Sequence, residues 1–202
     1  MPQTKKRRTQ AERTRASREK IIHSAMESFA QKGFRGAKMA DIAQAAHLTG
    51  PGLLHHFPSK THLLMEVLKE RDRIHKEQTD ATLEKNNHDI LQVATDLVEQ
   101  NQATPGIIQL FNLLVAESIS PEHPAHGYFT QRYHNGREAW VKIIKERQKD
   151  GEIRPDISAD VLGVMLFAMM DGLQVQWLME PEKINMAQIF RVFVHLLKKS
   201  EA

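Results

Sequence analysis

Cysteine is absent from the 202 residues of this chain. A disulfide framework, a thiolate metal site and a thiol nucleophile are therefore excluded, and a reducing compartment is compatible with the sequence. No apolar run reaches the ~18 residues of a membrane span, and the basic start is not followed by the apolar core of a signal peptide. With 41% hydrophobic and 26% charged residues, the composition is typical of a soluble globular protein, so we predict a cytoplasmic location.

Signatures of catalysis and of metal binding are also missing. The chain has no Gly-x-Ser-x-Gly, Walker loop, His-Glu-x-x-His or dinucleotide-type glycine pattern, and no segment reads as a strand. We therefore predict that the protein is not an enzyme and uses no cofactor. Among its eleven histidines, the best cluster for a metal comprises Glu122, His123, His126 and His134. Because His123 and His126, three residues apart, lie in a turn with prolines on either side, and no pair at helical ligand spacing has an obvious second shell, we interpret the cluster as a solvated turn and predict no metal.

Positive charge is concentrated at the amino end. Residues 1–20 carry eight basic and two acidic side chains, a net charge of +6, so the other 182 residues sum to −3 in a chain of net charge +3. A basic arm on a mildly acidic body indicates a polyanionic partner. Residues 1–16 have almost no large apolar side chain and are predicted to be a disordered arm. The arm is either a solvated tail or, beside a DNA-binding module, a contact for phosphates or a minor groove, which we favour.

Two short helices around a three-residue turn are predicted between Lys38 and Lys60. Thr49 is a suitable N-cap for the second helix, and Pro51 stands where the first turn needs no N–H. Gly50 and Gly52 would weaken a helix interior by ~1 kcal/mol each relative to alanine, but at a helix tip they allow the backbone to approach DNA. The apolar positions that we expect in the core are Ile42, Ala43, Ala46, Leu48, Leu53 and Phe57. The pattern is a helix-turn-helix.

A longer helix is predicted before this motif, over residues 17–32. Its apolar residues recur on one face, and Gly33 supplies a left-handed stop. Those residues are Ile21, Ile22, Ala25, Met26, Phe29 and Ala30. Together with the two short helices it forms a three-helix module of ~50 residues, whose small core leans on the rest of the chain.

The module resembles the DNA-binding domain of the TetR family of bacterial transcriptional repressors over residues 18–68. The resemblance rests on a first helix closed by glycine, an Ile-Ala pair in the second helix, and the run His56, Phe57, Ser59 and Lys60. The chain departs from the family at three positions. It has His47 and Pro51 where glycine is frequent, and Leu54 in place of a phosphate-contacting tyrosine, which removes one expected backbone contact.

Residues left over from the predicted core are candidates for contact with DNA. Because the second short helix lacks Arg, Gln and Asn, the usual bidentate base contacts are excluded, and specificity falls to Lys38, the histidines, thymine-methyl contacts and DNA shape. His55 is expected to contact DNA, whereas for His56 contact and internal packing are equally favoured. The resemblance implies a phosphate contact for Lys60, which follows the N-cap Ser59. The full candidate set is Lys38, Met39, Thr49, Gly50, Pro51, Gly52, Leu54, His55, His56 and Lys60.

The remainder of the chain is also predicted to be helical, so the fold class is all-α. Helices are expected over residues 61–85, 90–100, 105–118, 128–149, 158–179 and 186–198, with a domain boundary inside the first of them, near Leu68. The predicted organisation is an arm at 1–16, a DNA-binding domain at 17–68 and a ligand-binding and dimerisation domain, a helical bundle, at 69–202.

The helix expected over 158–179 has little polar face, so it must be covered on two sides, one of which is its own domain. A second copy of the chain is the simplest cover, and the family pairs its last two helices in this way. Gly163 and Gly172 are small enough for a close crossing. The predicted dimer residues are Val161, Met165, Gly172, Trp177, Ile189, Phe193 and Leu196.

Methionine and aromatic residues of the second domain could line a ligand pocket, although a core position is favoured for each taken singly. Asp171, in an apolar helix, must be hydrogen-bonded, exposed at a crossing or facing such a pocket. The candidate pocket residues are Phe111, Trp140, Met165, Met169 and Asp171.

The resemblance implies a sequence-specific DNA-binding regulator, more often a repressor, that is associated with the nucleoid when bound to DNA. It would bind a partly palindromic operator as a homodimer and leave it when a small, largely apolar ligand binds. Two alternatives are a helical protein-interaction module with a vestigial helix-turn-helix, suggested by Leu54, and a DNA-binding regulator without a small-molecule effector. The +6 charge of residues 1–20 favours DNA binding over the interaction module.

Overall fold

The computed structural model describes residues 9–86 and 89–198. These residues form nine α-helices and no strand, and one isolated antiparallel bridge joins Ile153 to Lys198. The chain divides into two compact units, which we call unit 1 (Met1–Asp72) and unit 2 (Arg73–Ala202). The division falls inside helix α4 (Lys60–Lys85), the same helix in which the sequence places a domain boundary near Leu68. The all-α prediction is confirmed.

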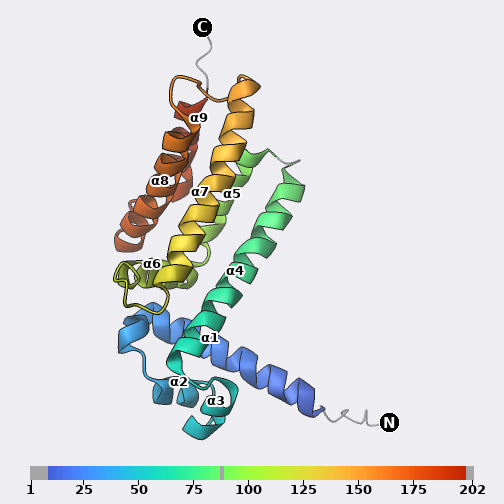
Figure 1. Cartoon of the computed structure of the whole chain (residues 1–202), viewed down its shortest axis with the longest axis vertical. Coiled ribbons are helices and arrows are strands. Elements are labelled where there is room, and N and C mark those ends of the chain that lie inside the picture. Colours follow the sequence, from blue (N-terminus) through green and yellow to red (C-terminus); the bar gives the residue numbers. More distant parts are fainter. Residues whose placement is uncertain (1–8, 87–88, 199–202) are drawn as a thin grey trace. The chain divides into compact units, whose positions relative to one another are not determined.

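Unit 1 comprises α1 (Gln10–Gly36), α2 (Met39–Ala45), α3 (Gly50–His56) and the first part of α4. Figure 1 shows α2 and α3 following the carboxyl end of α1. Gly33 has a positive φ of 66° and interrupts the helix one turn before Gly36. The core of the unit consists of fully buried side chains from all four helices: Ile21, Ala25, Phe29, Ile42, Leu53, Phe57, Leu63, Leu64 and Val67. Leu48, predicted to be a core residue, is half-buried.

The predicted disorder of residues 1–16 is wrong for residues 9–16. Helix α1 begins at Gln10 because Thr9 and Glu12 form a capping box. The Thr9 N–H donates to Glu12 Oε2 (2.7 Å), and the Glu12 N–H donates to Thr9 Oγ1 (3.2 Å). An Arg15–Glu19 pair (2.9 Å) one turn apart adds support. Extending an already packed helix needs no large apolar side chain. Residues 1–8 lie outside the described residues.

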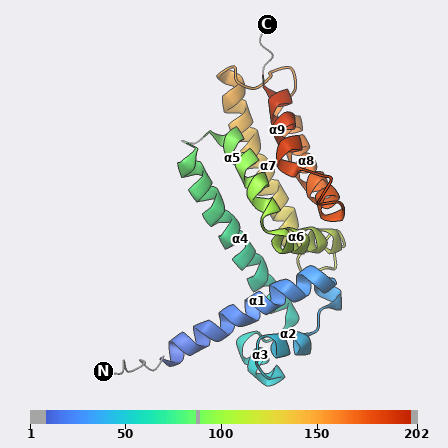
Figure 2. The ribbon, with the colours of Figure 1, turned by 180° about the vertical axis from the view of Figure 1, so that it is seen from behind.

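Unit 2 contains the second part of α4, α5 (Ile90–Gln102), α6 (Pro105–Glu117), α7 (His126–Lys149), α8 (Ala159–Met179) and α9 (Met186–Leu197). Both views show α7, α8 and α9 running side by side with α6 across one end (Figures 1 and 2). The apolar core draws on α5 to α9, with Leu166, Trp177 and Phe190 among its largest members. Helices α7 and α8 approach closely because two positions lack a side chain. A Cβ at Gly136 would lie 2.6 Å from the Phe167 ring, and one at Gly163 would lie 3.0 Å from Val141.

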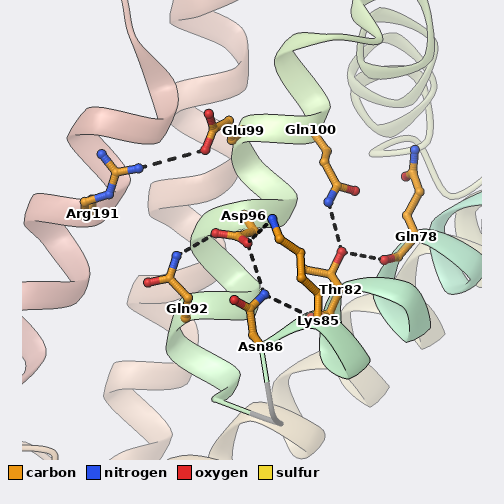
Figure 3. Close-up of polar contacts among 9 residues, drawn as sticks. All are labelled: Gln78, Thr82, Lys85, Asn86, Gln92, Asp96, Glu99, Gln100 and Arg191. Atoms are coloured by element: carbon orange, nitrogen blue, oxygen red, sulfur yellow. Dashed lines mark hydrogen bonds and ion pairs between the residues drawn. The ribbon is translucent and has the colours of Figure 1, made fainter.

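Polar side chains join α4 to α5 within unit 2 (Figure 3). Gln100 Nε2 donates to Thr82 Oγ1 (2.9 Å), and that hydroxyl donates to the Gln78 carbonyl (2.6 Å). Asn86 and Gln92 donate to the Asp96 carboxylate at 3.0 and 2.6 Å, with Lys85 3.6 Å away. Burial raises the pKa of Asp96, but the hydrogen bonds from Asn86 and Gln92 and the charge of Lys85 outweigh it and hold that pKa below its ordinary value. Asp96 therefore stays ionised and keeps accepting at neutral pH.

Helix α8 is both long and apolar. Among the described helices it is the one with the length and hydropathy of a membrane span, although 33% of the window is buried inside unit 2. Its buried residues pack against α6, α7 and α9, and include Leu162, Leu166, Leu173 and Trp177. Its opposite side is exposed at Val161, Val164, Met165, Val175 and Met179. This is a core helix of a bundle with one uncovered face.

Candidate nucleic-acid interface

Helices α2 and α3 form the predicted helix-turn-helix. Thr49 caps α3, since its hydroxyl accepts from the Gly52 N–H (3.2 Å), and Pro51 lies in the first turn, where no N–H is required. The turn between the helices places His47 in the left-handed region, with φ 58°. That conformation costs a non-glycine residue roughly 1–2 kcal/mol. The turn therefore keeps a strained side chain where the related family often has glycine.

One face of this motif is buried and the other is open. Ile42, Ala43, Ala46, Leu53 and Phe57 are buried, which agrees with their assignment to the core. Six of the predicted DNA contacts are exposed, and we call them the recognition surface: Lys38, Thr49, Gly50, Pro51, Leu54 and His55. Leu54 is 48% exposed on this surface. Met39, Gly52, His56 and Lys60 are half-buried beside it. The predicted residues thus lie on or beside α2, α3 and the start of α4, and none of them is fully buried.

His56, for which contact and packing were equally favoured, lies at the edge of the recognition surface. Its ring stands edge-on to that of His55, with centroids 5.6 Å apart, and its carbonyl accepts from Arg18 (3.3 Å). Partial burial, followed by the nearby charges of His55 and Arg18, lowers the pKa of His56 below 6.5. The free protein therefore holds this ring uncharged at neutral pH.

Lys60 has a role within unit 1 that the sequence did not predict. Its ammonium donates to the carbonyls of Ala37 (2.9 Å) and Arg35 (3.3 Å) and lies 4.7 Å from the centroid of the Phe34 ring. These contacts tie the first turn of α4 to the end of α1. A phosphate contact would have to use the remaining donor of the same ammonium. The N-cap prediction for Ser59 agrees with the bond that its hydroxyl accepts from the His62 N–H (3.2 Å).

In unit 2, the predicted pocket residues divide between core and surface. Phe111 is buried with its ring centroid 5.6 Å from that of Phe129, and Trp140 and Met169 are half-buried against the apolar core. Asp171 accepts from the Tyr133 hydroxyl (2.6 Å), so the hydrogen-bonded alternative holds for this carboxylate. Met165 is exposed, on the outer face of α8.

The predicted dimer residues also divide. Val161, Met165, Ile189 and Leu196 are exposed, and a Cβ at Gly172 would meet no atom within 4 Å. Trp177 and Phe193 instead belong to the subunit's own core, at 5% and 7% exposure, and Gly163 faces α7. Sequence reasoning missed four exposed positions on the same helices. We call the complete set the apolar strip: Val161, Val164, Met165, Val175, Met179, Ile189, Val192 and Leu196.

The histidine-rich turn between α6 and α7 is not a solvated turn at His123. That ring is buried, and its Nδ1 lies 2.9 Å from Ser118 Oγ and accepts from the Ala125 N–H (3.2 Å). His126 Nδ1 lies 2.8 Å from the Ser118 carbonyl. Both rings thus stabilise the turn after α6. Across residues 9–86 and 89–198, no three His, Asp or Glu side chains gather as a metal would require.

Comparisons with known proteins agree with this geometry. The family model for bacterial regulatory proteins of the tetR family matches residues 21–67. The transcriptional repressor KstR2 of Mycolicibacterium smegmatis is 27% identical over 152 residues, 72% of this chain and 71% of KstR2. The transcriptional regulator CymR of Pseudomonas putida is 39% identical over 75 residues, 34% of this chain and 37% of CymR. A solved transcriptional regulator from Saccharomonospora viridis, in complex with choline, has a TM-score of 0.74 and 24% identity, covering 91% of this chain and 98% of that one.

The exposed helix-turn-helix on an all-α chain defines a DNA-binding transcriptional regulator. Regulators of this kind act by binding DNA. Residues 21–67 of this chain carry the DNA-binding domain of the TetR family of bacterial transcriptional regulators.

Proposed function

We propose that this protein is a homodimeric repressor that occupies a partly palindromic operator until a small molecule binds unit 2. The recognition surface carries the proposal, because it presents the amino end of a capped helix and one cation, Lys38, without burying any of them. Such a helix enters a major groove by its amino end. The repressor KstR2 supports the direction of regulation. In cells the protein would be associated with the nucleoid while bound.

A second copy of this chain would cover the apolar strip. Exposed apolar side chains on two helices that pack against each other are typical of an association site. A two-fold dimer would have two α3 helices, one for each half-site of a partly palindromic operator, with about 34–36 Å between half-sites that are one turn apart. The basic segment before α1, residues 1–8, would add contacts to flanking phosphates or a minor groove, since it holds Lys5, Lys6, Arg7 and Arg8.

The effector would be small and largely apolar. Phe111, Trp140 and Met169 supply apolar surface from three helices of unit 2, with Asp171 and its Tyr133 partner as the polar element. The relative solved with choline supports binding of a small molecule by this fold. Release from DNA requires only that the ligand prefers one of two states, and about 1–3 kcal/mol of coupling is usual.

Fluorescence anisotropy with the DNA upstream of the protein's own gene tests this function. We expect binding that survives scrambled competitor and weakens with salt, and that falls for His55→Ala but not for His134→Ala, an exposed histidine on α7. A panel of apolar compounds would then be screened for release of the complex. Equal binding of both DNAs, followed by failure of a genome-fragment selection to enrich any sequence, would contradict specific recognition. Retention of DNA throughout the panel would favour a regulator without an effector.

A further inference from the structure

Arg18 of α1 joins the carboxyl end of α3 to α4. Its Nη1 donates to the His56 carbonyl (3.3 Å), and its Nη2 forms an ion pair with Glu66 Oε2 (3.1 Å). The guanidinium also lies 4.5 Å from the centroid of the Phe57 ring. The planar side chain of Arg18 therefore ties α1 to the consecutive helices α3 and α4, and we call this arrangement the Arg18 clamp.

Helix α3 is short. It is seven residues long, packs on α2 and buries Leu53, with Phe57 directly after it. The Thr49 cap is local to the helix and its turn, so it stabilises the helix without orienting it. The clamp acts at the opposite end, where a cation is also favoured by the helix dipole. The packing of Leu53 and of α2 holds the body of α3, and the bond to the His56 carbonyl and the stacking on Phe57 oppose movement of its carboxyl end.

Arginine suits this arrangement because its planar fork donates to α3 and α4 through two separate nitrogens while its face rests on an aromatic ring, whereas lysine would have to reach both acceptors from one nitrogen. Glu66 holds the fork in place and is itself bound by Lys69 (2.6 Å), which with Arg18 lowers the pKa of Glu66. The carboxylate therefore remains charged throughout the neutral range.

We infer that Arg18 is a positioning residue for operator recognition, which acts by fixing the angle at which α3 presents the recognition surface. The inference rests on the proposed function, because it assumes that this surface distinguishes an operator from other DNA. A phosphate contact at Arg18 would raise affinity for all sequences alike. Positioning should instead affect the operator selectively, since base contacts need a defined helix angle and phosphate attraction does not.

The test compares Arg18→Lys with Arg15→Ala as the matched control. Arg15 lies on the same helix, pairs with Glu19 and is 84% exposed, so its loss removes a charge without touching α3. For Arg18→Lys we expect operator affinity to fall about tenfold to a hundredfold, the range for a charge-assisted bond, with binding to scrambled DNA and its salt dependence within about twofold of wild type. The control should keep its preference for the operator.

Amide hydrogen exchange of residues 50–57 gives a readout that needs no operator. Exchange in α3 should accelerate in Arg18→Lys and in Glu66→Gln, while exchange in α1 and in unit 2 stays unchanged. Wild-type exchange in α3 together with an intact operator preference would overturn the inference, as would an equal loss of affinity for both DNAs. A wild-type protein with no sequence preference would overturn the proposed function as well, which separates the two failures.

Discussion

In the described part of unit 1, Leu54 is the single large apolar side chain that is strongly exposed, whereas unit 2 exposes nine. Eight of those nine form the apolar strip, and the ninth is Ile119, in the segment between α6 and α7. Unit 1 thus presents a largely polar outer surface suited to a polyanion, and unit 2 presents an apolar one suited to another protein chain. The partner proposed for each unit, DNA for unit 1 and a second chain for unit 2, matches the kind of surface that the unit exposes.

The two units also differ in how they fix their helices. In unit 1, Arg18 and Lys60 bind backbone carbonyls at the ends of α3 and α1. In unit 2, helices approach through apolar layers and through Gly136 and Gly163, where a Cβ would lie 2.6 Å from the Phe167 ring and 3.0 Å from Val141. A small core has too little apolar surface to fix the directions of its helices by packing alone. Charged side chains that bind the ends of the helices add the missing constraint.

The largest effect is expected from charging the apolar strip. Val192→Glu combined with Leu196→Glu would place four carboxylates in the two-fold interface, and each desolvated charge costs several kcal/mol. We expect dimer affinity to fall at least about a thousandfold by sedimentation equilibrium, with operator binding lost and helix content kept. Ala139→Glu, at an exposed position of α7, is the control. A double variant that remains dimeric would show that the strip has another role.

The two glycines of α3 lie in different surroundings. A Cβ at Gly50 would meet nothing within 4 Å, whereas one at Gly52 would lie 3.1 Å from Thr49 Oγ1. Gly50→Ala should leave the melting temperature almost unchanged, because the gain in helix propensity is offset by the position before proline, and should weaken operator binding about tenfold by crowding the DNA. Gly52→Ala should lower both the melting temperature and the affinity for the operator. Full operator affinity in Gly50→Ala would mean that the backbone does not approach DNA there.

Strain in the turn of unit 1 gives a smaller effect. His47→Gly should raise the free energy of unfolding by up to about 1 kcal/mol, because φ 58° is free for glycine, while the more flexible unfolded chain offsets part of the gain. Ala45→Gly, in the right-handed helix two residues earlier, should lower it by a similar amount. Urea titration measures both. Equal destabilisation by the two glycines would argue against strain at His47.

The smallest effect is a dependence of stability on pH through His56. Because the folded state lowers the pKa of His56 below 6.5, the unfolded chain takes up the proton first as pH falls. Stability is therefore fully present above pH 6.5 and declines as pH falls from there through the lowered pKa. His56→Gln should flatten the melting temperature over that window, whereas His134→Gln should keep the wild-type profile. A His56→Gln profile that still follows wild type would assign the decline to other groups.

Much of the fold could be predicted because its helices begin at local signals. Thr49, Ser59 and Ser158 each accept the bond expected of an N-cap. The start of α1 was missed although Thr9 and Glu12 have capping-box spacing, because the segment lacks apolar residues. The hydrogen bonds between Thr9 and Glu12 start the helix there, although the composition of the segment favours disorder.

The candidate sites were harder to predict where distant segments meet. The pattern of α8 is apolar on nearly all sides, so it cannot separate Trp177, which is in the core, from Val175, which is exposed. Arg18 gives no signal at all, since its partners His56 and Glu66 lie 38 and 48 residues further along the chain. The periodicity of apolar residues describes one helix by itself. The burial of Trp177, the exposure of Val175 and the contacts of Arg18 depend on how several helices pack together.

The apolar strip has a consequence for how the regulator responds to its own abundance. In the proposed dimer, each operator-competent molecule needs two chains, so below the dissociation constant the dimer concentration rises with the square of the chain concentration. Doubling synthesis would then nearly quadruple the occupancy of a weakly occupied operator. Repression would then change over a narrower range of protein concentration than it would for a monomer. The affinity between the eight side chains of the apolar strip and those of the second chain would set the concentration at which repression begins.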